Sequence, residues 1–184
     1  MQTDPNWTNF LWNRRTRKVE LVDFGATREY SKEFIDGWLR LLSAAVDEDR
    51  DACVEWSRKI GYLTGEENEV MVDAHVRSMV LLGTPFRAST AQPFRFGRGS
   101  SWADITGEIR AQIPVMLQHR LTPPPRETYS LNRCVGASWL ADLHVLIVRP
   151  RRKLSGAFLL ASRLNASVDC RTLWKRVTDG YRFE

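Results

Sequence analysis

The chain has 184 residues, of which 43% are hydrophobic and 27% charged, so it fits one globular domain with a real core and excludes a disordered, collagen-like or disulfide-built protein. Lysine and arginine number 27 against 22 aspartate and glutamate residues, and the net charge of +5 favours anionic partners such as nucleotides, acidic lipids or nucleic acid. No zinc-finger, RNA-recognition or helix-turn-helix signature is present, so no specific nucleic-acid partner is indicated, and a weak, salt-dependent nucleic-acid binder is only a distant rival reading.

The three cysteines, Cys53, Cys134 and Cys170, form no CxxC pair, which indicates reduced thiols and not a disulfide or zinc framework. Residues 1–10 lack the pattern of a signal or transit peptide. The longest apolar stretch, residues 139–148, is too short to span a bilayer.

Two short apolar runs near the N-terminus, residues 10–12 and 19–22, flank a basic turn and predict a β-hairpin. The Asp-Phe-Gly-Ala-Thr sequence at residues 23–27 then ends the second strand.

From Ser31, a suitable N-cap, the apolar period becomes helical. The expected stripe of the first helix consists of Phe34, Trp38, Leu41, Leu42 and Ala45. A second helix is expected from about residue 49 to 60, burying Cys53, Trp56 and Ile60. A third is expected over residues 66–82, with one face made of Val70, Met71, Ala74, Ser78 and Leu81.

Residues 84–100 are expected to form a loop, followed by helix at 101–113, more helix past Pro114, and a rigid break at 122–125. Helical patterns continue from about residue 127 to the C-terminus. The predicted fold is therefore mainly α with a short hairpin at the front.

The residues that indicate chemistry lie in the first 25 positions: Asn9 follows Asp4 by five residues, and Asp23-Phe24-Gly25 begins fourteen residues after Asn9. Protein kinases use an Asp, an Asn five residues later and then Asp-Phe-Gly, with a hairpin between the Asn and the Asp-Phe-Gly. The first Asp reaches the attacking group, and the Asn and the second Asp hold metal ions that bridge the phosphates. On spacing alone, a capped loop with an Asp-Pro turn and a strand-ending Asp remains an alternative.

A wider resemblance favours the kinase interpretation. Gln-Thr-Asp-Pro-Asn-Trp-Thr-Asn-Phe at residues 2–10 resembles the catalytic loop of the UbiB-like (aarF-domain) atypical kinases, closest to their coenzyme Q-linked mitochondrial branch, and residues 21–29 are similar to the metal-binding segment of that branch. Further similar stretches lie at residues 63–65, 73–75, 113–121 and 123–131.

The resemblance implies an α+β kinase-like fold and an ATP-dependent kinase or ATPase that uses Mg²⁺. Asp4 would be the catalytic-loop Asp, Asn9 and Asp23 the metal ligands, and Phe24 and Gly25 would shape the nucleotide-binding loop. It also implies ubiquinone (coenzyme Q) biosynthesis at the matrix face of the mitochondrial inner membrane, with coenzyme Q biosynthetic proteins and membrane lipids as partners.

The chain departs from this family at two places. Because Met1 falls inside the resembling catalytic loop, we expect residues 1–184 to be a C-terminal lobe without its N-terminal lobe, inactive alone and with negligible ATP binding. The other reading of such a lobe is a non-catalytic interaction or lipid-associated module. Residues 134–152 resemble nothing in the family, and we expect an insert from a retained intron or an alternative exon. His75 is expected to be a buried, hydrogen-bonded histidine, with a catalytic base as the weaker alternative.

Overall fold

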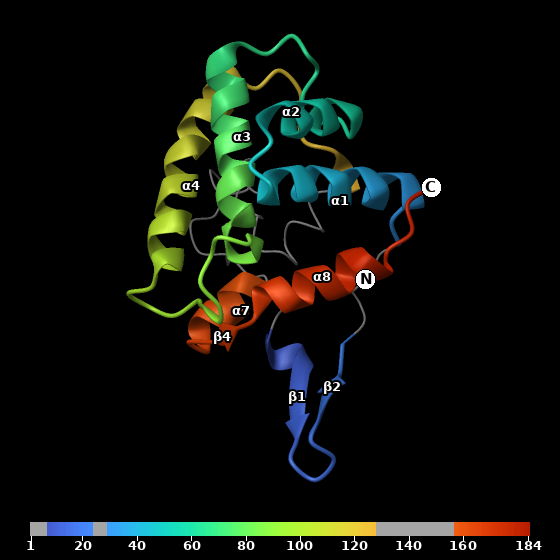
Figure 1. The fold of residues 1–184 in the computed structure, drawn as a ribbon, viewed down its shortest axis with the longest axis vertical. Coiled ribbons are helices and arrows are strands. Elements are labelled where there is room, and N and C mark those ends of the chain that lie inside the picture. Colours follow the sequence, from blue (N-terminus) through green and yellow to red (C-terminus); the bar gives the residue numbers. More distant parts are fainter. Residues whose placement is uncertain (1–6, 24–28, 128–156) are drawn as a thin grey trace. The chain divides into compact units, whose positions relative to one another are not determined.

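A computed structural model describes residues 7–23, 29–127 and 157–184 (Figure 1). The chain divides into two compact units, one made of Met1–Glu29 with Arg126–Leu160 and the other of Tyr30–Pro125 with Ala161–Glu184. The expected mainly α fold with a hairpin near the N-terminus is confirmed. The proposed insert at residues 134–152 lies outside the described residues.

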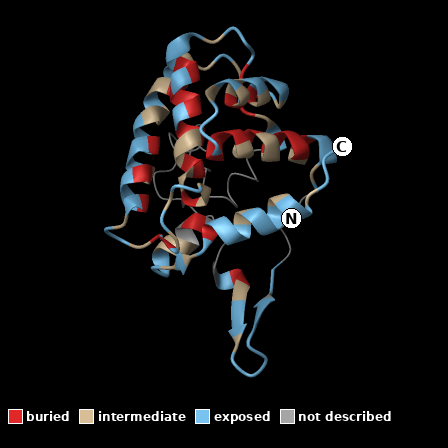
Figure 2. Cartoon of the chain, viewed as in Figure 1, coloured by how far each residue is buried: buried red, intermediate tan, exposed pale blue. Residues whose placement is uncertain are grey.

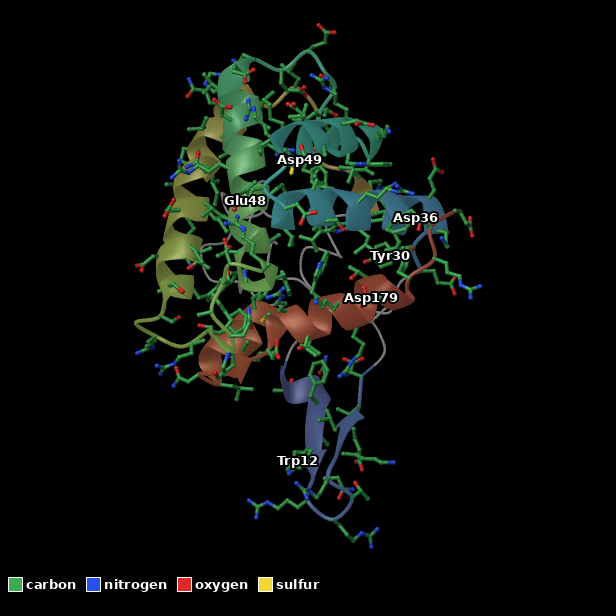
Figure 3. All side chains as sticks on the ribbon, in the orientation of Figure 1. Trp12, Tyr30, Asp36, Glu48, Asp49 and Asp179 are labelled. Atoms are coloured by element: carbon green, nitrogen blue, oxygen red, sulfur yellow. The ribbon has the colours of Figure 1, made fainter. Side chains whose placement is uncertain are left out.

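The hairpin belongs to the first unit. It consists of a 3₁₀ turn, η1 (Trp7–Asn9), followed by the antiparallel strands β1 (Phe10–Asn13) and β2 (Lys18–Leu21). The side-chain oxygen of Asn13 accepts hydrogen bonds from the backbone N–H groups of Arg15 and Thr16, which closes the basic turn. The predicted hairpin is thus confirmed, and its apolar residue Trp12 is 58% exposed (Figure 3).

Helices build the second unit. They are α1 (Lys32–Val46), α2 (Arg50–Lys59), α3 (Glu69–Gly83), the short η2 (Thr84–Phe86), α4 (Ser101–His119) and α8 (Cys170–Gly180). α3 packs against both α1 and α4, and α1 also packs against α2. A further helix, α7 (Ala157–Arg163), begins in the first unit and ends in the second.

The helices begin where short polar side chains satisfy free N–H groups of the first turn. The Ser31 hydroxyl accepts from the backbone N–H of Phe34 at 3.2 Å, which confirms the predicted cap of α1. The first N–H groups of the other capped helices are bonded in the same way by Asp49, Asn68 and Asp169.

The core confirms most of the predicted stripe of α1. Phe34, Trp38, Leu41 and Ala45 are buried, whereas Leu42 is half-buried. Figure 2 shows buried and half-buried positions along this helix.

Four other residues of the predicted apolar faces are not buried. Trp56 in α2 and Ile60 at its C-terminal cap are only half-buried, and the small Ser57, four residues after the buried Cys53, faces the core instead. The cationic groups of Arg40 and Lys59 lie over the ring of Trp56, at 5.1 and 4.2 Å from its centre, so charged side chains cover part of this ring. In α3, Val70 is 54% exposed because it lies in the first turn, and Leu81 is half-buried.

Pro114 does not interrupt the helix that contains it, although separate helical stretches were expected before and after it. α4 runs without a gap from Ser101 to His119. A proline removes the bond to the carbonyl four residues earlier, here Arg110. Both Pro114 and Arg110 are exposed, so water can satisfy that carbonyl and the helix continues.

A second, very short sheet was not predicted. β3 (Phe94–Arg95) pairs antiparallel with β4 (Ser167–Val168), and the backbone N–H of Phe96 extends the pairing to the carbonyl of Ala166 at 2.9 Å. The expected loop at residues 84–100 and the expected helix to the C-terminus are wrong at these positions. Two-residue strands are too short to show a period of two.

Cys53 and Cys170 are free and buried, and burial raises the pKa of each thiol to about 11. Among the helices in the described ranges, none combines the length and the apolar character needed to cross a membrane.

Candidate functional site

Of the five residues predicted to carry the chemistry, two are described. Asn9 is the last residue of η1 and is buried, and Asp23 follows β2 by two residues and is exposed. Asp4, Phe24 and Gly25 lie outside the described residues.

The hairpin brings the chain positions of Asn9 and Asp23 together. Its register pairs Phe10 with Leu21, and one step further the backbone N–H of Val22 donates to the carbonyl of Asn9 at 3.1 Å. The residue before Asp23 is therefore bonded to Asn9 itself. Fourteen residues of sequence separation become neighbouring positions at the base of one hairpin, which is what two ligands of one ion require.

The donor chemistry of the two residues suits a hard cation. An amide oxygen and a carboxylate are ligand types that Mg²⁺ accepts, and proteins usually hold this ion with one or two carboxylates together with substrate phosphates. In the described part of the chain, no three His, Cys, Asp or Glu side chains gather as a metal cage would require. The donor types of Asn9 and Asp23 are compatible with Mg²⁺.

His75, the other candidate, is a core residue. It is fully buried in α3, its Nε2 is 2.8 Å from the Ser57 hydroxyl, and the ring of Tyr62 lies 5.3 Å away, centre to centre. Burial, followed by the positive charge of Arg120, lowers the pKa of His75 from 6.5 to about 3. The expected buried, hydrogen-bonded histidine is confirmed, while its partner Ser57 was not foreseen.

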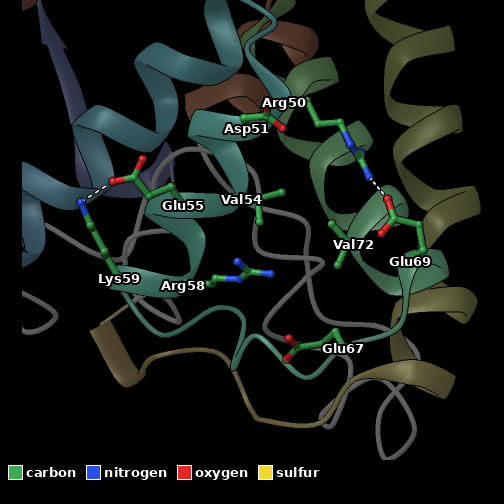
Figure 4. Close-up of a pocket in the computed structure, with 9 residues that line it drawn as sticks. All are labelled: Arg50, Asp51, Val54, Glu55, Arg58, Lys59, Glu67, Glu69 and Val72. Carbon is green, nitrogen blue, oxygen red and sulfur yellow. Dashed lines mark hydrogen bonds and ion pairs between the residues drawn. The ribbon is translucent and has the colours of Figure 1, made fainter.

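A hollow of about 520 Å³ lies between α2 and the first turn of α3 (Figure 4). Its charges are largely matched, because Arg50 pairs with Glu69 and Lys59 pairs with Glu55. This hollow is not predictable from the sequence, since its walls come from an ordinary amphipathic helix, the loop that follows it and the first turn of α3.

A cluster of polar residues on α1 was not predicted either. Lys32 and Asp36 are bonded to one another and to the segment that follows α8. The only local signal was the i,i+4 spacing of a lysine and an aspartate, which is common on exposed helices.

Comparison with known proteins places the hairpin in a family context. Residues 1–57 match the ABC1 atypical kinase-like domain, and this range contains both Asn9 and Asp23. The protein named "Atypical kinase COQ8, mitochondrial" of Saccharomyces cerevisiae is 44% identical over 177 residues, which cover 96% of this chain and 31% of that protein.

Two other relatives show the same extent of similarity. The protein of the same name from Schizosaccharomyces pombe is 42% identical over 181 residues, covering 98% of this chain and 26% of the relative. "Atypical kinase COQ8B, mitochondrial" of Rattus norvegicus is 42% identical over 175 residues, covering 95% of this chain and 28% of the relative.

This chain spans less than a third of the length of each of these relatives. Its helices and its N-terminal strand pair agree with the mainly α, kinase-like C-terminal part that the sequence predicted. The resemblance noted from the sequence is therefore confirmed: the chain carries a match to the ABC1 atypical kinase-like domain and is similar over nearly its whole length to a fragment of mitochondrial atypical kinases.

Proposed function

We propose that this chain is the part of an ATP-dependent atypical kinase or ATPase that carries the catalytic loop and the metal ligands. In this proposal Asp4 is the catalytic-loop aspartate, Asn9 and Asp23 are the Mg²⁺ ligands, and Phe24 and Gly25 shape the loop that receives the nucleotide. The ion, when bound, would neutralise the phosphates of ATP and fix their position.

The observation that carries this proposal is the bond between the Val22 N–H and the Asn9 carbonyl. It supports the proposal because it ties the backbone of one proposed ligand to the residue beside the other. A spacing match with no hairpin would have left Asn9 and Asp23 unrelated in space.

The cellular role is proposed from the three relatives described above, each of which is named as a mitochondrial atypical kinase. We place the whole protein in ubiquinone biosynthesis, at the matrix face of the mitochondrial inner membrane. Coenzyme Q biosynthetic proteins and membrane lipids are its proposed partners. The segment at residues 134–152 is proposed to be an addition that this role does not need.

A chain exchange in yeast tests the proposed role. The matching part of the Saccharomyces cerevisiae relative is replaced by this chain, and ubiquinone content is measured in cells that lack the native gene. We expect the chimera to restore ubiquinone, the Asp23→Asn chimera to fail, and a chimera without residues 134–152 to perform at least as well as the intact one.

The matched control is Asp47→Asn, an exposed aspartate that caps the C-terminal end of α1. Western blotting shows whether each chimera accumulates to the same level. Equal ubiquinone content in the Asp23→Asn and Asp47→Asn chimeras would overturn the proposed role of Asp23.

A further inference from the structure

The segment that follows α8, residues 181–184, lies against α1 and is held there by hydrogen bonds. The Tyr181 hydroxyl donates to one carboxylate oxygen of Asp36 at 2.6 Å, and the backbone N–H of Glu184 donates to the other oxygen at 2.9 Å. Lys32 donates to the backbone carbonyl of Arg182 at 2.8 Å. Asp36 is labelled on α1 in Figure 3.

The carboxylate of Asp36 is the central hydrogen-bond acceptor of this contact. Its side chain is only 10% exposed, and a buried carboxylate is costly unless hydrogen bonds compensate for the lost water. Donors from Tyr181, Glu184 and Lys32 supply those bonds. The Tyr181 hydroxyl, then the Glu184 N–H and then Lys32 lower the pKa of Asp36 to about 2, so the carboxylate is fully charged at neutral pH.

Aromatic contacts complete the surface. The guanidinium of Arg40 lies 4.3 Å from the centre of the Phe183 ring and 5.1 Å from that of Trp56, so one cation bridges the segment and α2. The ammonium of Lys32 lies 5.2 Å from the centre of the Tyr181 ring. The same ammonium is 3.8 Å from a carboxylate oxygen of Glu184.

These contacts are selective for a short sequence pattern. They engage a tyrosine hydroxyl, a main-chain carbonyl, a phenylalanine ring, and a main-chain N–H with an acidic side chain, in that order along the segment. The side chain of Arg182 is exposed, so the second position is the least restricted. The pattern is Tyr-x-Phe-acidic, and its first residue, Tyr181, has the extended backbone that short recognition peptides use.

We propose that Lys32, Asp36, Arg40 and Trp56 form a peptide-binding site for segments of the pattern Tyr-x-Phe-acidic, and that residues 181–184 fill this site in cis. A partner protein that presents such a segment binds there by displacing the chain's own segment. The proposal is independent of the metal site and of the function proposed above.

A free peptide must compete with residues 181–184, which already occupy the site. A tethered segment has an effective concentration of the order of millimolar, so a free peptide of equal intrinsic affinity competes poorly with it. Weakening the tethered segment while leaving α1 unchanged therefore raises the apparent affinity of a free peptide. The apparent affinity of the free peptide rises by the same factor as the fraction of sites that residues 181–184 leave unoccupied, and we expect this factor to be at least about ten.

The test uses the full chain and a fluorescein-labelled peptide with the sequence of residues 178–184, followed by fluorescence anisotropy. The double variant Tyr181→Phe, Phe183→Ala is expected to bind the peptide at least about tenfold more tightly than the unmodified chain. Adding Asp36→Asn to the double variant removes that binding, and a peptide carrying the same Phe and Ala replacements does not bind. Arg176→Ala, an exposed position on α8, is the matched control and behaves like the unmodified chain.

Thermal melting establishes that each variant folds. If the double variant does not fold, Tyr181→Phe alone, which removes a single hydroxyl, gives the same comparison with a smaller gain. A folded Tyr181→Phe, Phe183→Ala variant that fails to bind the peptide, or binding that survives the added Asp36→Asn, would overturn the proposal.

Discussion

The close approach of α3 to α1 at Gly83 leads to a sharp prediction. A Cβ atom added at Gly83 would lie 2.9 Å from the carbonyl oxygen of Ala45, and 3.0 Å from both the carbonyl carbon of Ala45 and the backbone nitrogen of Val46. All three are backbone atoms of α1, so no side chain can rotate away to make room. Overpacking of this kind costs about 1–3 kcal/mol, which exceeds the gain of roughly 0.5–1 kcal/mol that alanine brings to a helix.

Gly107 is the matched control because it also lies within a helix, α4, but a Cβ there would meet nothing within 4 Å. We expect Gly107→Ala to raise the free energy of unfolding by up to about 1 kcal/mol and Gly83→Ala to lower it. Urea denaturation of the two variants beside the unmodified chain measures both changes. If Gly83→Ala stabilises the chain as Gly107→Ala does, the close helix contact is wrong.

Three further predictions concern buried polar groups. Ser57→Ala removes the partner of His75 Nε2 and should lower the free energy of unfolding by about 1–3 kcal/mol in urea titrations; an unchanged midpoint would contradict the buried pair. Because the pKa of His75 is about 3 when folded and 6.5 ordinarily, the unfolded chain binds the proton first, so stability falls as pH drops below 6.5, by at most about 1.4 kcal/mol per unit. In urea titrations between pH 6.5 and 4.5, the free energy of unfolding should depend less steeply on pH for His75→Gln than for the unmodified chain. Equal slopes for the two chains would argue against a lowered pKa of His75. The charge of Asp36 stabilises the fold above the ordinary pKa of 3.8, and this stabilisation is lost as pH falls towards 2. Carboxyl NMR should show a titration midpoint of Asp36 near 2 in the unmodified chain and a higher midpoint in Tyr181→Phe. A midpoint near 3.8 in the unmodified chain would refute the contact.

Local signals made part of this structure predictable. The hairpin follows from two apolar runs around a basic turn, and the start of α1 follows from the cap at Ser31, because both depend on residues that are neighbours in sequence. The spacing of Asn9 and Asp23 was informative for the same reason: the hairpin between them is itself local.

Long-range contacts were not predictable from the chain alone. The pairing of Phe94 with Val168 joins two segments that each lack a strand signal. The partner of His75 could not be identified, since Ser57 on another helix carries no mark that distinguishes it from a surface serine. The contact between Asp36 and Tyr181 spans 145 residues, and only the fold brings its two ends together.

The central claim is that Asn9 and Asp23 hold a Mg²⁺ ion shared with ATP. The most direct measurement is the melting temperature of the purified yeast chimera with and without ATP, as a function of Mg²⁺ concentration, because a ligand that binds only the native state must raise stability. Our account predicts Mg²⁺-dependent stabilisation by ATP in the chimera and in its Asp47→Asn control, and a loss of that stabilisation in Asp23→Asn. Stabilisation of Asp23→Asn by ATP at the same Mg²⁺ concentrations as the control would contradict it.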